Sequence, residues 1–149
     1  MNGYSFFAPT KVLFGAGKLG ELGAQKLPGT KALIVTTGGN SVKRFGYLGR
    51  LAAELDRAGV AHELFDLIEP DPLSATVNAG GWMARTHGCD FVLALGGGSV
   101  MDGSKGICAV AANPHTDAEG NECPGDIWDF VNGGTALGLP IPNDPLPLV

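Results

Sequence analysis

The chain has 149 residues, the size of one ordinary domain, and is 44% hydrophobic, 17% charged and 7% aromatic. This composition excludes a disordered tail, a coiled coil and a collagen-like repeat. The net charge is −5 and the basic residues are scattered singly or in pairs, so we expect no nucleic-acid partner.

The first part of the chain predicts a hairpin, a helix, a strand and a second helix. Residues 5–7 and 11–14 are β-prone runs on either side of a proline, which suggests an N-terminal β-hairpin. Leucines at helical spacing predict a helix over 17–27, and the apolar run 31–36 predicts a buried strand. Apolar residues recur at helical spacing over 48–58 and predict the second helix.

The rest of the chain continues this alternation. The expected elements are a strand over 61–67, a helix capped by Asp71 or Ser74 and reaching residue 87, a strand over 90–95, a helix over 99–112, a loop over 113–134 with a short helical stretch near 126–131, and the start of a strand at 146–149. Alternating strands and helices indicate βα units. We therefore expect one α/β domain over 1–149, a Rossmann-like parallel sheet flanked by helices.

The strongest local signal is a glycine turn directly after the third of these strands. Gly96, Gly97 and Gly98 end the strand, and Ser99 opens the next helix. Such a turn presents free backbone N–H groups and the positive end of the helix dipole to an anion such as a pyrophosphate. The alternative is a capping box of Ser99 and Asp102 over a tight turn. Capping needs only one small residue, however, and leaves three consecutive glycines unexplained.

A second glycine-rich segment, GAGKLG at residues 15–20, fits the dinucleotide fingerprint GxGxxG. The strand before it is short and lies in the expected hairpin. A structural turn is therefore the favoured interpretation, and the fingerprint is the alternative.

The third glycine-rich segment, TTGGNS at residues 36–41, follows the first buried strand. In a site for NAD, a carboxylate near this position binds the ribose 2′-hydroxyl and repels a 2′-phosphate. This stretch has no carboxylate, and it offers backbone amides, neutral polar groups and positive charge suited to NADP, from Gly38, Gly39, Asn40, Ser41, Lys43 and Arg44. The alternative is an ordinary loop and helix cap with solvated cations.

The sequence offers no clear nucleophile or metal site. It has no GxSxG elbow, and its three histidines are too scattered for a metal-binding helix motif. Cys89 and Cys108 are expected to be core thiols. A weak alternative is a cation site in one loop, formed by His115, Asp117, Glu122 and Cys123.

The cellular compartment is also suggested by the sequence. The three cysteines are odd in number and lack CxxC spacing, which is typical of a reduced intracellular protein. The first residues do not form a leader, and no window reaches about 18 apolar residues. We expect a cytoplasmic protein with no membrane segment.

Three segments in order carry a family resemblance. These are APTKVLFGAGKLGEL at 8–22, TTGGNSVKRFG at 36–46, and IEPDPL with LALGGGSVMDGSK between 68 and 105. Together they resemble the iron-containing (group III) alcohol dehydrogenases, in particular the butanol-dehydrogenase-like branch. The resemblance covers essentially the whole chain and implies the dehydroquinate-synthase-like N-terminal domain of that family.

The resemblance also implies roles for the glycine segments. The turn from Gly96 to Ser99 would receive the pyrophosphate, and Asp102 would lie near the nicotinamide riboside. The stretch Gly38, Gly39, Asn40 and Ser41 would surround the 2′-phosphate of NADP, whereas Gly15 and Gly17 would form a structural turn.

The implied reaction is hydride transfer between NADP, with NAD less favoured, and a small primary alcohol or aldehyde. A divalent metal, iron or zinc, would act as Lewis acid. Family members continue with a threonine-rich cofactor loop and a helical domain whose Asp and three His hold the metal, and these ligands are absent from the 149 residues. We expect a truncated cofactor-binding half without catalytic or metal-ligating residues, in a homo-oligomer or paired with a C-terminal half. The alternatives are a non-catalytic nucleotide-binding module and a relative acting on a polyol or phosphosugar.

Overall fold

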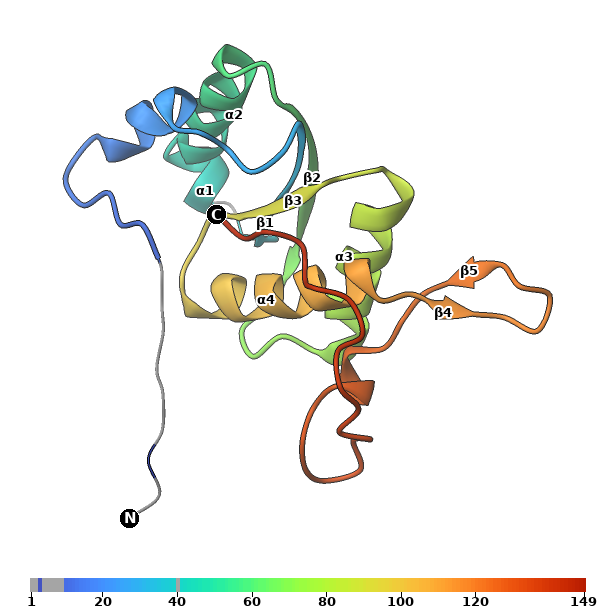
Figure 1. Ribbon diagram of the computed structural model, residues 1–149. Coiled ribbons are helices and arrows are strands. Elements are labelled where there is room, and N and C mark those ends of the chain that lie inside the picture. The colour runs from blue at the N-terminus through green and yellow to red at the C-terminus, as the bar shows by residue number, and fades with distance from the viewer. Residues whose placement is uncertain (1–2, 4–9, 40) are drawn as a thin grey trace.

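The computed structural model describes residues 3, 10–39 and 41–149, and its centre is a three-stranded parallel sheet (Figure 1). The strands are β1 (Lys31–Thr37), β2 (Ala61–Ile68) and β3 (Phe91–Ala94), in the order β2-β1-β3. β1 pairs in parallel with both neighbours. The expected α/β class with a parallel sheet is confirmed.

Helices connect the strands, and most lie close to their expected positions. They are α1 (Ser41–Arg44) and α2 (Tyr47–Arg57) between β1 and β2, α3 (Ser74–Thr86) between β2 and β3, and α4 (Gly98–Ala112) after β3. The other elements are two 3₁₀ helices, η1 (Lys18–Ala24) and η2 (Ile127–Asp129), and a short antiparallel pair, β4 (His115–Thr116) and β5 (Glu122–Cys123).

The sheet separates two hydrophobic cores. Successive side chains of a strand point to opposite faces, so Leu33 and Val35 of β1 pack with α3 and α4, whereas Ala32 and Ile34 pack with α2. All four side chains are fully buried. Burial on both faces explains why the sequence of β1 is a continuous apolar run and does not alternate with polar residues.

Glycines let α3 and α4 approach closely. A Cβ atom at Gly80 would lie 2.5 Å from Cδ1 of Ile107. At Gly81 it would lie 2.7 Å from Cγ1 of Val110 and 3.2 Å from the backbone nitrogen of Ala111. This contact holds α4, and with it the glycine turn at the start of α4, in place beneath the sheet.

Residues 146–149 extend the sheet on the far side of β3. The Val92 N–H donates to the Pro147 carbonyl at 2.9 Å, the Val149 N–H donates to the Val92 carbonyl at 3.0 Å, and the Ala94 N–H donates to the Val149 carbonyl at 2.9 Å. Leu148 and Val92 form a parallel bridge. The strand expected to start at this position is present only as this isolated bridge.

The expected N-terminal hairpin is not found in the described residues. Its first half, residues 5–7, lies outside them, and residues 11–14 form no strand. Phe14 is 93% exposed, and the Lys11 amine donates to the Gln25 side chain at 2.7 Å. This run therefore pairs with no strand in the described structure, and its β propensity alone does not form one.

Three further local expectations were wrong in detail. The helix expected over 17–27 is the shorter 3₁₀ helix η1, whose sequence contains two helix-weakening glycines. Neither Asp71 nor Ser74 caps α3; the Glu69 carboxylate accepts from the Leu73 N–H at 3.2 Å and from the Thr76 hydroxyl at 2.8 Å. The loop after α4 contains the pair β4 and β5, which the Arg85–Glu122 ion pair attaches to α3.

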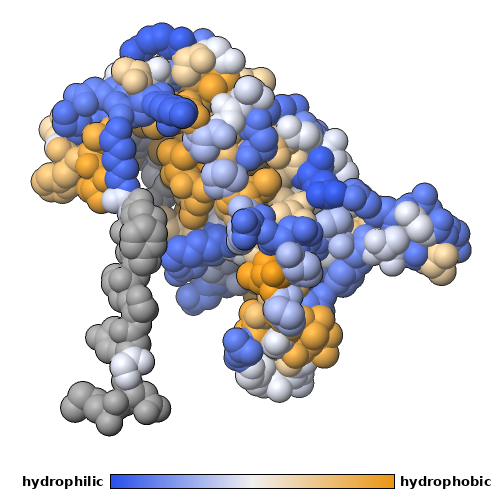
Figure 2. Space-filling view, in the orientation of Figure 1, coloured by the Kyte–Doolittle hydropathy of each residue, from blue (hydrophilic) through white to orange (hydrophobic). Residues whose placement is uncertain are grey.

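Apolar side chains also reach the surface. Figure 2 shows orange apolar areas between blue polar ones, and the exposed large apolar residues include Val12, Phe14, Leu67, Leu73 and Leu137. Contiguous areas of this kind are typical of surfaces that other protein elements cover. Within the described ranges, no helix has the length and apolar character needed to cross a membrane.

The contact between α3 and α4 makes a testable prediction. We expect Gly81→Ala to destabilise the chain by about 1–3 kcal/mol, because the added methyl group must displace Val110 or the α4 backbone. Gly49→Ala in α2 is the matched control: its Cβ meets nothing within 4 Å, so helix propensity should stabilise the chain by about 0.5–1 kcal/mol. Urea unfolding measures both. Equal stability of Gly81→Ala and the wild type would contradict the packing described.

Candidate functional site

The carboxyl ends of the parallel strands meet at one edge of the sheet. The chain leaves β1 towards α2 on one face and leaves β3 towards α4 on the other, so the strand order reverses between β1 and β3. In open α/β sheets, ligands bind in the crevice at such a switch point. Both glycine segments expected to bind a cofactor start at this point.

A buried hydrogen bond holds the two strand ends side by side. Thr36 is only 1% exposed, and its hydroxyl donates to the Leu95 carbonyl at 2.8 Å. The Leu95 N–H in turn donates to the Val35 carbonyl at 2.8 Å. A hollow of about 200 Å³ lies between the segments that follow, lined by Ser41, Val42, Tyr47, Leu95 and Gly96. The hollow therefore connects the two glycine segments.

The turn after β3 presents backbone amides at the start of a long helix. α4 has 15 residues, its N-cap is Gly97, and no side chain caps it. The first N–H groups of an α-helix have no acceptor within the helix. Gly96, Gly97 and Gly98 are exposed, so these amides are open to an anion at the positive end of the helix dipole.

The three glycines of this turn differ in what they contribute to the fold. A Cβ at Gly96 would lie 2.5 Å from Cγ2 of Val100, so packing requires glycine there. At Gly97 and Gly98 a Cβ would meet nothing within 4 Å, and neither residue has a positive φ that favours glycine. The fold therefore gives no reason for glycine at these two positions, whereas the close approach of a ligand to the backbone gives one.

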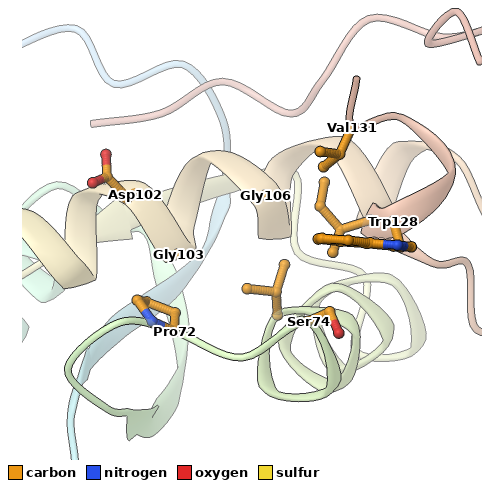
Figure 3. Close-up of a pocket in the computed structure, with 9 residues that line it drawn as sticks. Pro72, Ser74, Asp102, Gly103, Gly106, Trp128 and Val131 are labelled. Atoms are coloured by element: carbon orange, nitrogen blue, oxygen red, sulfur yellow. The ribbon is translucent and has the colours of Figure 1, made fainter. Parts of the chain in front are cut away.

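The capping-box alternative for this turn is wrong. Ser99 is not the N-cap, and Asp102 forms an ion pair with Lys105 at 3.0 Å. Asp102 lies at one end of a mostly apolar hollow of about 220 Å³, and Trp128 lies at the other end (Figure 3). The Asp102 carboxylate is thus exposed beside the glycine turn and free of a structural role in capping α4.

The segment after β1 brings most of its predicted residues to the same edge. Gly38, Gly39 and Ser41 are exposed there, whereas Asn40 lies outside the described residues. The Lys43 amine extends from α1 and is 2.6 Å from the Asp66 carboxylate of β2. Arg44, the other cation of this segment, lies 5.8 Å from the Phe45 ring centroid.

Asp66 is a residue of this site that the sequence did not reveal. It follows Lys43 by 23 residues along the chain and belongs to a different strand. The register of β1 and β2 shifts between Val35 and Thr37, because two residues of β2, Asp66 and Leu67, lie opposite one residue of β1. Bulges of this kind redirect side chains, and sequence patterns give little indication of them.

The glycine segment at 15–20 is structural. Its second half forms the start of η1 (Lys18–Ala24), and the described residues just before it form no strand. The Gly23 N–H of η1 donates to the buried Glu54 carboxylate at 2.9 Å, which anchors η1 to α2. This segment lies apart from the crevice between β1 and β3, as the favoured interpretation predicts.

Among residues 3, 10–39 and 41–149, no three His, Cys, Asp or Glu side chains are close enough together to hold a metal ion. His115 contacts Asp129 at 2.6 Å, and Glu122 contacts Arg85, so the cation site considered for this loop is not formed. Burial raises the pKa of Cys89 to about 11 and that of Cys108 to about 12, as expected for core thiols.

The glycine turn generates a stability prediction. We expect Gly96→Ala to lower the free energy of unfolding by about 1–3 kcal/mol, since its Cβ would overlap the buried Val100 side chain. The double substitution Gly97→Ala with Gly98→Ala should change stability by less than about 0.5 kcal/mol. Thermal melting of both variants tests this, and a large loss in the double variant would show that these glycines serve the fold.

Comparison with known proteins identifies the family. The sequence pattern of the family "Iron-containing alcohol dehydrogenase" matches residues 9–149. The NADPH-dependent aldehyde reductase YqhD of Escherichia coli is 38% identical over 143 residues, 95% of this chain and 34% of that protein. The NADH-dependent butanol dehydrogenase A of Clostridium acetobutylicum is 36% identical over 143 residues, again 95% of this chain and 34% of that protein.

Solved structures agree with these relatives. An archaeal halo-thermophilic alcohol dehydrogenase from a Red Sea brine pool superposes with a TM-score of 0.84 at 36% identity, over 99% of this chain and 36% of that one. The chain thus spans about a third of the length of the relatives it matches. Taken with its glycine turns at the switch point of a parallel sheet, the match over residues 9–149 shows that the chain belongs to the iron-containing alcohol dehydrogenase family.

Proposed function

We propose that this chain is the NADP-binding part of an alcohol dehydrogenase or aldehyde reductase of the iron-containing type. The observation that carries the proposal is the pair Gly97 and Gly98. Both are exposed at the start of α4 in the switch-point crevice, and neither is needed for packing or backbone conformation. Bare amides at such a position suit a dinucleotide pyrophosphate.

Every predicted site residue except Gly96, where packing requires glycine, takes a binding role in this proposal. The amides from Gly97 to Ser99 bind the pyrophosphate, and the Asp102 carboxylate orients the nicotinamide riboside. The adenosine end lies across the hollow between the two glycine segments, where its 2′-phosphate meets the residues after β1, Gly38, Gly39, Asn40, Ser41 and Lys43. When bound, the dinucleotide supplies hydride transfer at its nicotinamide ring. The residues of this chain hold and orient it.

The preference for NADP rests on charge. Lys43 supplies a cation beside the glycine segment after β1, and a 2′-phosphate binds cations more strongly than a ribose hydroxyl does. Relatives named for each coenzyme match at similar identity, NADH-dependent at 36% and NADPH-dependent at 38%. The preference of this chain therefore has to be measured directly.

The remaining parts of the proposed activity concern the whole protein. Relatives are named for butanol and aldehydes, so we assign small primary alcohols or aldehydes as substrates. The described residues do not fit a metal site, and the metal of the proposed enzyme, iron or zinc, would need ligands from outside them. Exposed apolar residues such as Leu67 and Leu73 suit association with a C-terminal half or a second copy of the chain. The compartment we propose for this enzyme is the cytoplasm.

Titration of coenzyme fluorescence tests this function. We expect the wild-type chain to bind NADPH more tightly than NADH. The double variant Gly97→Ala with Gly98→Ala should weaken binding of both coenzymes at least about tenfold, which is roughly 1.4 kcal/mol, because two methyl groups block the amides. Ala118→Gly, exposed in the turn between β4 and β5 and far along the chain from both glycine segments, serves as the control. Unchanged affinity in the double variant, or no binding by the wild type, would contradict the proposal.

A further inference from the structure

The inference concerns Asp66 and rests on the cofactor-binding function proposed above. Residues 40–46, directly after Gly38 and Gly39, include no Asp or Glu, yet the fold brings the Asp66 carboxylate to this segment. A Cβ at Gly38 would lie 3.1 Å from the backbone carbonyl oxygen of Asp66, so the two backbones are in close contact. The bulge in β2 places Asp66 at this point.

The Asp66 carboxylate is held by Lys43. Its Oδ2 atom lies 2.6 Å from the Lys43 Nζ, and the side chains are 31% and 49% exposed, so both also reach solvent. The other two cations nearby lie against aromatic rings: Arg44 is 5.8 Å from the Phe45 ring centroid and Arg50 is 4.7 Å from that of Tyr47. Asp66 is therefore paired with Lys43, the cation that we propose binds the 2′-phosphate of the coenzyme.

This pairing has opposite consequences for the two coenzymes. A 2′-phosphate beside Lys43 also lies beside a carboxylate of like charge, which opposes its binding. The ribose 2′-hydroxyl of NADH carries no charge and can donate a hydrogen bond to a carboxylate. Lys43 thus favours the phosphorylated coenzyme and Asp66 disfavours it.

We propose that Asp66 is a specificity-determining residue of the cofactor site, which neutralises Lys43 and so limits the preference for NADPH over NADH. The carboxylate that usually follows a glycine segment in NAD sites is here supplied by the neighbouring strand. The ratio of the two dissociation constants, NADH over NADPH, is then set by the balance between one lysine and one aspartate.

Fluorescence titration of both coenzymes, in the wild type and in two single variants, measures this ratio. Asp66→Asn preserves the shape of the side chain and removes its charge, and we expect the ratio to rise about tenfold. Lys43→Gln should lower the ratio about tenfold. Both shifts should shrink in high salt, since the two side chains are partly exposed. Asp56→Asn is the matched control: it also removes one negative charge, from a 73% exposed side chain in the last turn of α2.

The outcomes separate the inference from the proposed function. If wild type binds a coenzyme but the ratio in Asp66→Asn moves no more than in Asp56→Asn, the inference is overturned and the proposed function stands. If the wild type binds neither coenzyme, the proposed function fails and the inference with it. Circular dichroism checks the fold of each variant. If Asp66→Asn does not fold, the Lys43→Gln variant provides the test. An unchanged ratio of the NADH and NADPH dissociation constants in Lys43→Gln also overturns the inference.

Discussion

The parallel pairing of β1 with β3 is the constraint on which the candidate site depends. The buried Thr36 hydroxyl and the Leu95 amide join the ends of these strands through hydrogen bonds of 2.8 Å. Each strand then continues into a glycine segment, and the two segments turn towards opposite faces of the sheet. The strand order places a crevice at this switch point, and the glycine segments expose backbone amides beside it.

Glycine serves different purposes at different places in this molecule. At Gly80, Gly81 and Gly96 a Cβ would lie 2.7 Å or less from a neighbouring side chain, so glycine there permits close packing of α3, α4 and the turn after β3. At Gly97 and Gly98 the space is open. Nine other described glycines have a positive φ, a backbone conformation that favours glycine in turns and helix ends. The high glycine content, 24 of 149 residues, thus reflects turns, dense helix packing and an exposed backbone at the site.

Strands and helices with strong apolar patterns were predictable. The strand expected over 31–36 is buried on both faces of the sheet, and its sequence contains a continuous apolar run. The helix expected over 48–58 packs against the core with one face only, and its apolar residues recur at helical spacing. Features that depend on tertiary contacts were not predictable. The expected hairpin strand at 11–14 finds no strand partner in the described structure, and Glu69 binds the start of α3 from outside the helix through Leu73 and Thr76. Asp66 enters the site only through a bulge between strands.

The bare amides at the start of α4 are proposed to bind the phosphates of a nicotinamide dinucleotide. Amide chemical shifts recorded during NADPH titration of the 15.3 kDa chain test this binding most directly. We expect the signals of Gly97, Gly98 and Ser99 to move the most and to saturate together, while that of Gly120, exposed in the turn between β4 and β5, stays in place. Saturable NADPH binding that leaves these three amide signals unmoved would contradict the account.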